Sequence, residues 1–402
     1  MNRYLIINTA VMALLIITIS CDKLLTTAPE AGDDFETPFD PLPNELNAMF
    51  AAGDEAFDRA FTASDGLGPI FNNVACAACH SADGRGTPSR ALTRFSRNFD
   101  LIPDEGGPQL QDKAIPGVPV EQLPPNVQIS VRMPPAVFGM GLIEAISDST
   151  ILSNEDPTDA DGDGISGRVN WVTAGEFVPS ANVGGGSGLQ VGRFGLKANI
   201  SSLLEQVVNA YHQDMGITSD FIPVENSHQD GEGIAIGDIA PDPEISAQTV
   251  LDVVVYVRLL SPPARGDITT EVTLGESLFN GIGCVSCHIP SMKTGVHNVP
   301  QLNQVDANLY SDLLLHDMGN GLADFRPDGS ADGFEWRTTP LWGLRLVPNF
   351  LDGSAFYLHD GRATTLEDAI EFHGGEAKTA SDAFTAFSQN EKDALIVFLK
   401  SL

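Results

Sequence analysis

The chain has 402 residues, of which 42% are hydrophobic and 19% are charged, as in a folded protein with room for two or three domains. Its 54 acidic residues against 22 basic ones give a formal net charge of −32. This balance argues against a nucleic-acid partner, because few cations remain to neutralise phosphates, and it favours a basic macromolecular partner.

The N-terminus reads as an export signal. Arg3 precedes a nearly unbroken apolar run that reaches Ile19, and Cys21 follows almost at once. This order resembles a bacterial lipoprotein signal, so we expect a signal peptide over 1–20, lipidation at Cys21 and an acidic, proline-rich tether over 21–46. A plain cleaved signal and a retained anchor are the alternatives. All three place the mature chain on the periplasmic side of a bacterial cell envelope, and in the first case a lipid anchor is the only membrane attachment.

Apolar residues at helical spacing recur in the body of the chain, whereas strand signals are few and short. They predict helices over about 201–212, 246–260 and 389–402, the second of them stopped by two prolines. Pro- and Gly-rich segments between about 100 and 245 indicate long loops. We therefore expect a mainly α protein with extensive loops.

A Cys-x-x-Cys-His motif occurs twice, and this is the attachment motif of c-type haem. The two sulfurs bond to the porphyrin, and the histidine becomes the proximal ligand of the iron. A zinc site or a redox dithiol are the alternatives, but the chain has no further cysteine pair to complete a four-ligand zinc site. The sequence thus predicts two covalently bound haem c groups. Their attachment residues are Cys76, Cys79 and His80 in the first motif and Cys284, Cys287 and His288 in the second.

A short helix, a haem motif and a closing helix form the layout of a small cytochrome c domain, and the chain has this layout twice. We expect the first cytochrome c-like domain, with the long loop-rich insertion, over 47–265. The second is expected over 272–402.

The ligand on the other face of each iron decides whether a haem transfers electrons or meets a substrate. Met292 lies too near His288 in sequence to reach that face. The candidates for the second haem are Met318, His297, His316, His359 and His373, and those for the first are Met133, Met140, Lys197 and His212.

Several longer motifs resemble the bacterial di-haem oxidoreductase family, whose members are often labelled peroxidase or "thiol oxidoreductase". The motifs lie at 192–198, 214–219, 310–319, 335–343, 359–362 and 373–376, in the order of the family. Leu196 departs from the pattern, since Trp is expected there. A more distant similarity is to di-haem cytochrome c peroxidases and their MauG-type relatives, which have two cytochrome c domains.

The similarity to the peroxidases implies roles for particular residues. His373 falls where those enzymes have the methionine ligand of the electron-transfer haem, so it is expected to be the distal ligand of the second haem. His316 and His359 are then expected near the haem edge as catalytic residues, and Arg362 beside a propionate. The first haem would be the reactive one, with Glu144 as an acid/base that moves a proton between the peroxide oxygens. A solvated or paired glutamate is the alternative.

A loop in the insertion resembles the start of a calcium site. Asp159, Asp161 and Asp163 stand at alternate positions, and Gly164 follows. The twelfth position is Asn170 and not the bidentate glutamate, so we expect a single calcium loop and no EF-hand pair. A merely acidic turn is the alternative.

These patterns lead to one leading hypothesis. The protein would be a di-haem c-type oxidoreductase of the cell envelope, peroxidase-like, in which the second haem passes electrons to a reactive first haem. A basic redox protein or a quinol-linked donor would supply the electrons, and a small oxidant such as hydrogen peroxide would be reduced. The alternatives are an electron-transfer cytochrome without a substrate site, oxidation of a thiol or another donor at haem iron, and a non-enzymatic role in envelope iron handling.

Overall fold

The computed structural model describes residues 32–179, 188–226, 236–351 and 353–402. The predicted signal peptide, Cys21 and the first part of the tether lie outside these residues. Within the described residues, the structure has no helix that is both long and apolar enough to span a membrane.

Helices account for 33% of the residues, so the prediction of a mainly α protein holds only in part. Most of the remaining chain is loop, as the Pro- and Gly-rich segments indicate. The α-helices of the described residues are α2 (Asn44–Asp58), α3 (Met140–Ala145), α4 (Asp148–Leu152), α5 (Leu203–Asn209), α7 (Ala247–Leu259), α8 (Thr270–Gly281), α9 (Leu366–Glu371), α10 (Lys378–Thr385) and α11 (Gln389–Leu399).

The described strands are short, as expected, and pair into antiparallel two-stranded sheets. The pairs are β1 (Ile70–Phe71) with β3 (Lys113–Ala114), β2 (Leu92–Ser96) with β4 (Gln128–Arg132), β5 (Trp171–Val172) with β6 (Gln190–Val191), β7 (Met292–Lys293) with β8 (Asp306–Ala307), and β9 (Leu315–Asp317) with β10 (Glu335–Arg337).

The predicted helices begin and end close to the expected residues. The hydroxyl of Ser246 accepts a hydrogen bond from the backbone of Thr249 and so caps the start of α7. Ser388 and Glu391 form a capping box at the start of α11. The helix expected over 201–212 is α5, extended by a π-helical turn over Ala210–Asp214.

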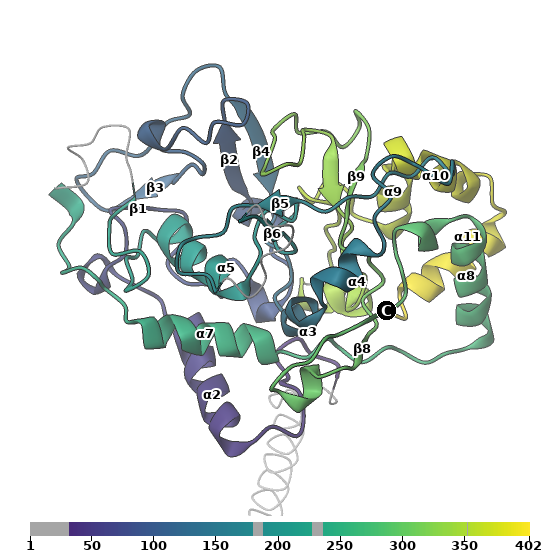
Figure 1. Ribbon diagram of the computed structural model, residues 1–402, viewed down its shortest axis with the longest axis horizontal. Coiled ribbons are helices and arrows are strands. Elements are labelled where there is room, and N and C mark those ends of the chain that lie inside the picture. The colour runs from purple at the N-terminus through teal and green to yellow at the C-terminus, as the bar shows by residue number, and fades with distance from the viewer. Residues whose placement is uncertain (1–31, 180–187, 227–235, 352) are drawn as a thin grey trace, which may run out of the picture.

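Two pairs of helices cross in the same way, α2 on α7 and α8 on α11 (Figure 1). A glycine lies at each crossing. A Cβ atom on Gly53 would lie 2.2 Å from the carbonyl oxygen of Asp252, and one on Gly275 would lie 2.0 Å from that of Ala394. Each crossing therefore needs a residue without a side chain at this point.

An aromatic pair packs beside each crossing and leads towards the haem motif. The ring centroids of Phe57 and Tyr256 are 5.4 Å apart, and those of Phe279 and Phe398 are 5.2 Å apart. Phe57 in turn lies 6.3 Å from the ring of His80, and Phe279 lies 6.2 Å from that of His288. The same local packing thus holds both motif histidines.

The apolar core is shared between the two halves of the chain. The larger cluster contains Phe138 and Val254 from the first half together with Leu313 and Trp342 from the second, while a smaller cluster gathers around α8, α9 and α11. Cys76 packs against the larger cluster and Cys284 against the smaller one. The expected division near 262–272 therefore does not separate two independent cores.

Candidate di-haem site

The two Cys-x-x-Cys-His motifs fold into the same tight turn. In the first, the carbonyl oxygen of Cys76 accepts hydrogen bonds from the backbone N–H groups of Cys79 and His80, each at 3.0 Å. In the second, the carbonyl oxygen of Cys284 accepts from the N–H groups of Cys287 and His288. Each turn brings the backbone of the second cysteine and of the histidine back to that of the first cysteine.

His80 and His288 are held by the same kind of hydrogen bond. Nδ1 of His80 lies 2.8 Å from the carbonyl oxygen of Pro135, and Nδ1 of His288 lies 2.9 Å from that of Tyr310. A carbonyl oxygen only accepts, so Nδ1 carries the proton in both rings. Burial lowers the pKa of each histidine to about 4, which leaves Nε2 unprotonated with its lone pair available to a metal.

His373 shows the same arrangement. Its Nδ1 lies 2.7 Å from the carbonyl oxygen of Ala369, one turn earlier at the end of α9, and burial lowers its pKa. A positive charge on His373 would lower the pKa of His288, so the two side chains are close enough for their charges to interact. Their pairing as the ligands of the second haem stays a prediction.

His316 cannot ligate iron in this arrangement because both ring nitrogens are engaged. Nε2 lies 2.9 Å from a carboxylate oxygen of Asp312, and Nδ1 lies 2.7 Å from one of Glu376. Burial lowers the pKa of His316, but these hydrogen bonds and that to Cys287 raise it to about 12. His316 is therefore a buried imidazolium, 3.7 Å from the Cys287 sulfur.

His359 and Arg362 lie on one turn and both approach Asp360, Nε2 of His359 at 3.7 Å from a carboxylate oxygen. The ring of His359 stacks on Trp336 at 3.8 Å, and burial lowers its pKa to about 4. The guanidinium of Arg362 forms an ion pair with Asp360 at 2.7 Å. Arg362 therefore contacts a carboxylate of the chain, Asp360, where a haem propionate was expected.

A cavity of about 280 Å³ lies at the first motif, and Cys76, Cys79 and His80 line it. β4 leads into one wall through Met133, Pro134 and Pro135, and α5 and α7 contribute apolar side chains to others. Among the described residues that line this cavity, His80 is the only histidine, whereas three are methionines. They are Met133, Met140 and Met215.

Asp214 lines this cavity, and the sequence analysis gave it no role. The amide of Gln109 donates to its Oδ1 at 2.7 Å. Burial raises the pKa of Asp214 to about 6, although that hydrogen bond and the charge of Arg94 lower it. A carboxyl group at this place can hold or release a proton near neutral pH. Its position in one of the recognised motifs was the only signal in the sequence.

Glu144, the predicted acid/base, is not among the residues that line the cavity. One carboxylate oxygen accepts from the backbone N–H of Leu203 at 3.0 Å, at the start of α5, and the other accepts from Arg258 at 2.6 Å. Glu144 therefore joins α3, α5 and α7. This arrangement matches the paired glutamate that was the alternative and does not suit proton transfer at the first haem.

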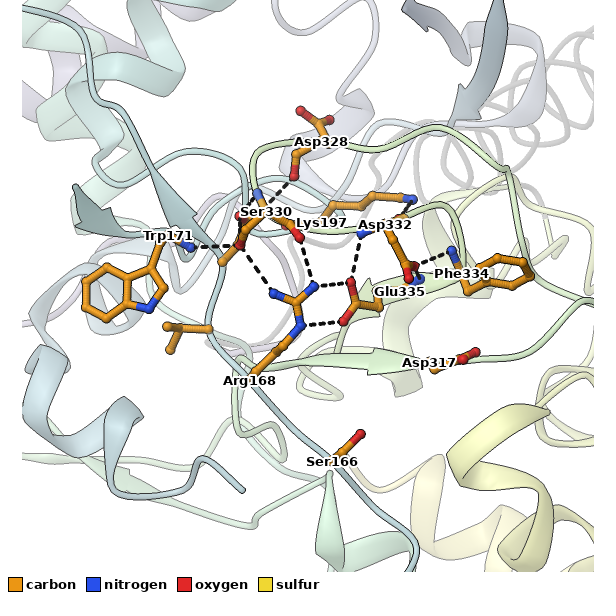
Figure 2. A network of polar contacts seen from close by, with 12 residues as sticks. Ser166, Arg168, Trp171, Lys197, Asp317, Asp328, Ser330, Asp332, Phe334 and Glu335 are labelled. Atoms are coloured by element: carbon orange, nitrogen blue, oxygen red, sulfur yellow. Dashed lines mark hydrogen bonds and ion pairs between the residues drawn. The ribbon is translucent and has the colours of Figure 1, made fainter. Parts of the chain in front are cut away.

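Lys197, a candidate ligand of the first haem, is buried elsewhere. Its ammonium group donates to Asp324 and to the backbone oxygens of Arg326 and Asp332, at 2.7 to 2.9 Å. Figure 2 shows it beside the loop that also holds Arg168. All three of its donors are used, so Lys197 is not free to bind iron in this arrangement.

Three other ligand candidates form no hydrogen bond with a motif histidine among the described residues. They are His212, Met318 and His297. Nε2 of His212 lies 2.9 Å from the carbonyl oxygen of Val224, and Nδ1 of His297 accepts from the backbone of Val299. Burial lowers the pKa of His297, and the charge of Arg258 on α7 lowers it further.

The acidic loop of the insertion differs from the predicted calcium ligand set. Asp159 and Asp161 lie together, but the third member of their cluster is Asp156 and not Asp163. The carboxylate of Asp156 also accepts the backbone N–H of Ala160 at 2.8 and 2.9 Å. Calcium binding at this loop stays a prediction.

The thiols do not resemble those of a redox dithiol. Burial raises the pKa of Cys76 and of Cys284 to about 12, whereas nucleophilic or metal-binding cysteines need the thiolate form. Cys287 does lie near Asp312 and His316, but that histidine has both nitrogens bonded to carboxylates. Two turns of this kind, each with a neutral histidine, fit the class of haem proteins.

The comparisons with known proteins agree with this class. The family model described as "Di-haem oxidoreductase, putative peroxidase" matches residues 22–99 and 116–402. The chain belongs to the di-haem oxidoreductase family. No curated protein matches it.

Two solved structures align over most of the chain at low similarity. Hydrazine synthase from Kuenenia stuttgartiensis is 16% identical, with 94% of this chain and 96% of that chain covered and a TM-score of 0.40. A MauG-like protein associated with microbial copper homeostasis is 15% identical, with 94% of both chains covered and a TM-score of 0.40. At these scores the likeness supports no argument about fold or activity.

Proposed function

We propose that the protein is a peroxidase-like oxidoreductase with two covalently attached haem c groups. The first would be bound by Cys76, Cys79 and His80, and the second by Cys284, Cys287 and the histidine pair His288 and His373. The observation that carries the proposal is the hydrogen bond shared by His80, His288 and His373, each of which donates Nδ1–H to a carbonyl oxygen, so that Nε2 is the nitrogen left for a metal. These residues fit the group, because iron takes a neutral imidazole nitrogen.

The two sites differ in what surrounds the proximal histidine. His373 near His288 would give the second haem two histidine ligands, which suits electron transfer. The cavity at His80 has no second histidine among its described lining residues, so the first haem would be open or loosely closed. A haem held at His80 would supply the electrons and the iron that reduce a small oxidant such as hydrogen peroxide.

The chain's own contribution to that reduction is proton transfer and the exclusion of water. Gln109 holds Oδ1 of Asp214, and the other carboxylate oxygen would take a proton from the bound oxidant and return it. Apolar side chains from α5 and α7, among them Leu203, Val207 and Val257, would limit the access of water. Asp214 replaces Glu144 in this role.

The donor, the location and the calcium loop are further parts of the proposal. A net charge of −32 favours a basic redox protein over an anionic donor, with a quinol-linked donor as the alternative. Electrons would enter at the second haem. The apolar N-terminus and Cys21 support attachment to the periplasmic side of the envelope, and calcium would bind at Asp156, Asp159 and Asp161.

One observation favours a second candidate function. Met133, Met140 and Met215 line the cavity, and a thioether on the first iron would make the protein an electron-transfer cytochrome.

The purified di-haem protein would be reduced with a one-electron donor and mixed with hydrogen peroxide in an assay of donor oxidation. Catalytic oxidation supports the enzyme, whereas stoichiometric oxidation of two equivalents at most supports the cytochrome.

A further inference from the structure

Four arginines line the cavity at the first motif, although the chain has only 22 basic residues in all. They come from four separate segments. Arg94 lies on β2, and Arg132 lies on the same face of its partner strand β4. Arg85 follows the first motif, and Arg337 ends β10 in the second half of the chain.

Arg85 and Arg337 have no carboxylate partner among the described residues. Arg85 donates to the carbonyl oxygen of Leu358 at 2.7 Å, and Arg337 donates to those of Gly195 and Thr338 at 3.0 and 3.3 Å. Burial lowers the pKa of each guanidinium to about 10, so both remain charged at neutral pH.

Arg94 and Arg132 share one carboxylate with a third arginine. Asp328 lies 2.7 Å from Arg132, 2.9 Å from Arg326 and 4.0 Å from Arg94. Burial raises the pKa of Asp328, but the three guanidiniums hold it well below its usual range. Three positive charges thus surround Asp328, and even with Asp214 on the same cavity the arginines outnumber these two carboxylates.

Several guanidinium nitrogens in this wall also lack an acceptor. Nε of Arg85, Nε of Arg94 and Nη2 of Arg132 are buried and make no hydrogen bond. A buried donor without a partner is costly, and an unpaired buried charge costs more. Because a resting protein bears this cost continuously, the missing acceptor is expected to be a permanent anionic group and not a transient substrate.

We propose that Arg85, Arg94, Arg132 and Arg337 bind the two propionate carboxylates of the haem attached at Cys76 and Cys79. Carboxylates accept the paired N–H groups of guanidinium in two parallel hydrogen bonds, and two of them would offset part of the excess charge. The inference rests on the proposed function, because it needs a haem at this motif.

The test uses the full-length protein with both haems attached and the variants Arg85→Gln and Arg337→Gln. The matched control is Arg97→Gln, an arginine outside the cavity that pairs with Glu105 at 2.6 Å. The reduction potential of each haem is measured from pH 6 to pH 9, and resonance Raman spectra report the propionate bending modes. The potential that is unchanged in a His373→Met variant identifies the first haem.

We expect either cavity variant to lower the potential of the first haem, to make it pH-dependent as the released propionate titrates, and to shift a propionate mode. Arg97→Gln should do none of these. Unchanged potential and Raman modes in variants that keep both haems would overturn the inference. It would also be overturned if the variants lost only the binding of added azide, because the arginines would then serve an exchangeable anion.

Two further measurements keep the result interpretable. If a glutamine variant does not fold, Arg85→Lys and Arg337→Lys retain the charge but not the paired geometry, and they should shift the propionate mode with a smaller change in potential. Mass spectrometry counts the attached haems first. A chain that never acquires two haems contradicts the proposed function itself, whereas two haems with unmoved propionate modes contradict only the arginine assignment.

Discussion

At the scale of single residues, three histidines share one hydrogen-bonding pattern at Nδ1. His80, His288 and His373 direct Nδ1–H to a backbone oxygen, while His316 donates from both nitrogens to carboxylates. The backbone thus selects the nitrogen that is left for iron. This is a property of the folded chain that residue type alone does not reveal.

Replacement of His373 tests the assignment of the second haem. We expect His373→Met to raise the reduction potential of one haem and leave the other unchanged, because a thioether ligand favours the ferrous iron more than imidazole does. Spectroelectrochemical titration of the di-haem protein measures this. His297→Met is the control, since His297 lies against α7, and equal potentials in all three proteins would rule His373 out as a ligand.

Replacement of Asp214 tests the proton-transfer group. We expect Asp214→Asn to lower peroxide-dependent turnover by about 100-fold with both haems retained, because general acid–base catalysis commonly contributes that much. The wild-type rate should also fall as the pH drops through about 6, where Asp214 takes up its proton, and the variant should lack this fall. Turnover in Asp214→Asn equal to that of the exposed control Asp104→Asn would show that Asp214 is not the acid/base.

At the scale of elements, the two helix crossings position the two motifs, and a glycine permits each close approach. A methyl group on Gly53 or Gly275 would meet a carbonyl oxygen at 2.2 or 2.0 Å, so the helices would have to separate. We expect Gly53→Ala and Gly275→Ala each to lower the free energy of unfolding by about 2 kcal/mol or more. Thermal and urea unfolding followed by circular dichroism measure the change.

Gly281 supplies the control for these two variants. It ends α8, and a Cβ there would meet no atom within 4 Å. Gly281→Ala should change the free energy of unfolding by no more than about 0.5 kcal/mol. If all three alanine variants unfold alike, close approach at the crossings is not what the glycines provide.

At the scale of the whole molecule, the acidic composition makes stability depend on pH. Burial raises the pKa of Asp83, Glu121 and Glu244 to about 7 and that of Glu225 to about 8. A carboxyl group whose pKa is raised on folding stabilises the protein at low pH, and this contribution is lost as the pH rises through the folded value. The imidazolium of His316 acts in the same direction, since its folded pKa is also raised.

We therefore expect the thermal midpoint to fall by about 5 °C between pH 6.5 and pH 8.5, a window in which these groups all change in the same sense. Differential scanning calorimetry measures the fall. Glu121→Gln removes one of the groups and should make the dependence shallower. A midpoint that rises over this window would contradict the assignment of these buried carboxyl groups.

The sequence predicted the features that depend on neighbouring residues. The haem motifs, the cap at Ser246 and the ends of α7 and α11 follow from short-range patterns. The sites of Asp214 and Lys197 did not, because each depends on segments that meet only in the folded chain. Lys197 lies in a motif beside the cavity residue Leu196, yet its ammonium group is bound by a loop more than a hundred residues later.

The four arginines of the cavity could not be predicted from the sequence either. Arg85, Arg94, Arg132 and Arg337 have no common spacing in the sequence, and only the approach of β2, β4 and β10 to the first motif collects them. Composition suggested an acidic protein throughout. The excess of positive charge in this one cavity wall is therefore information that the fold alone supplies.

The most direct test of the central claim is electron paramagnetic resonance of the ferric, di-haem protein before and after a slight excess of hydrogen peroxide. The account predicts one low-spin haem with two histidine ligands, and one high-spin haem whose signal is lost when peroxide is added. Two low-spin haems that do not respond to peroxide, in the ferric or the half-reduced protein, would contradict it.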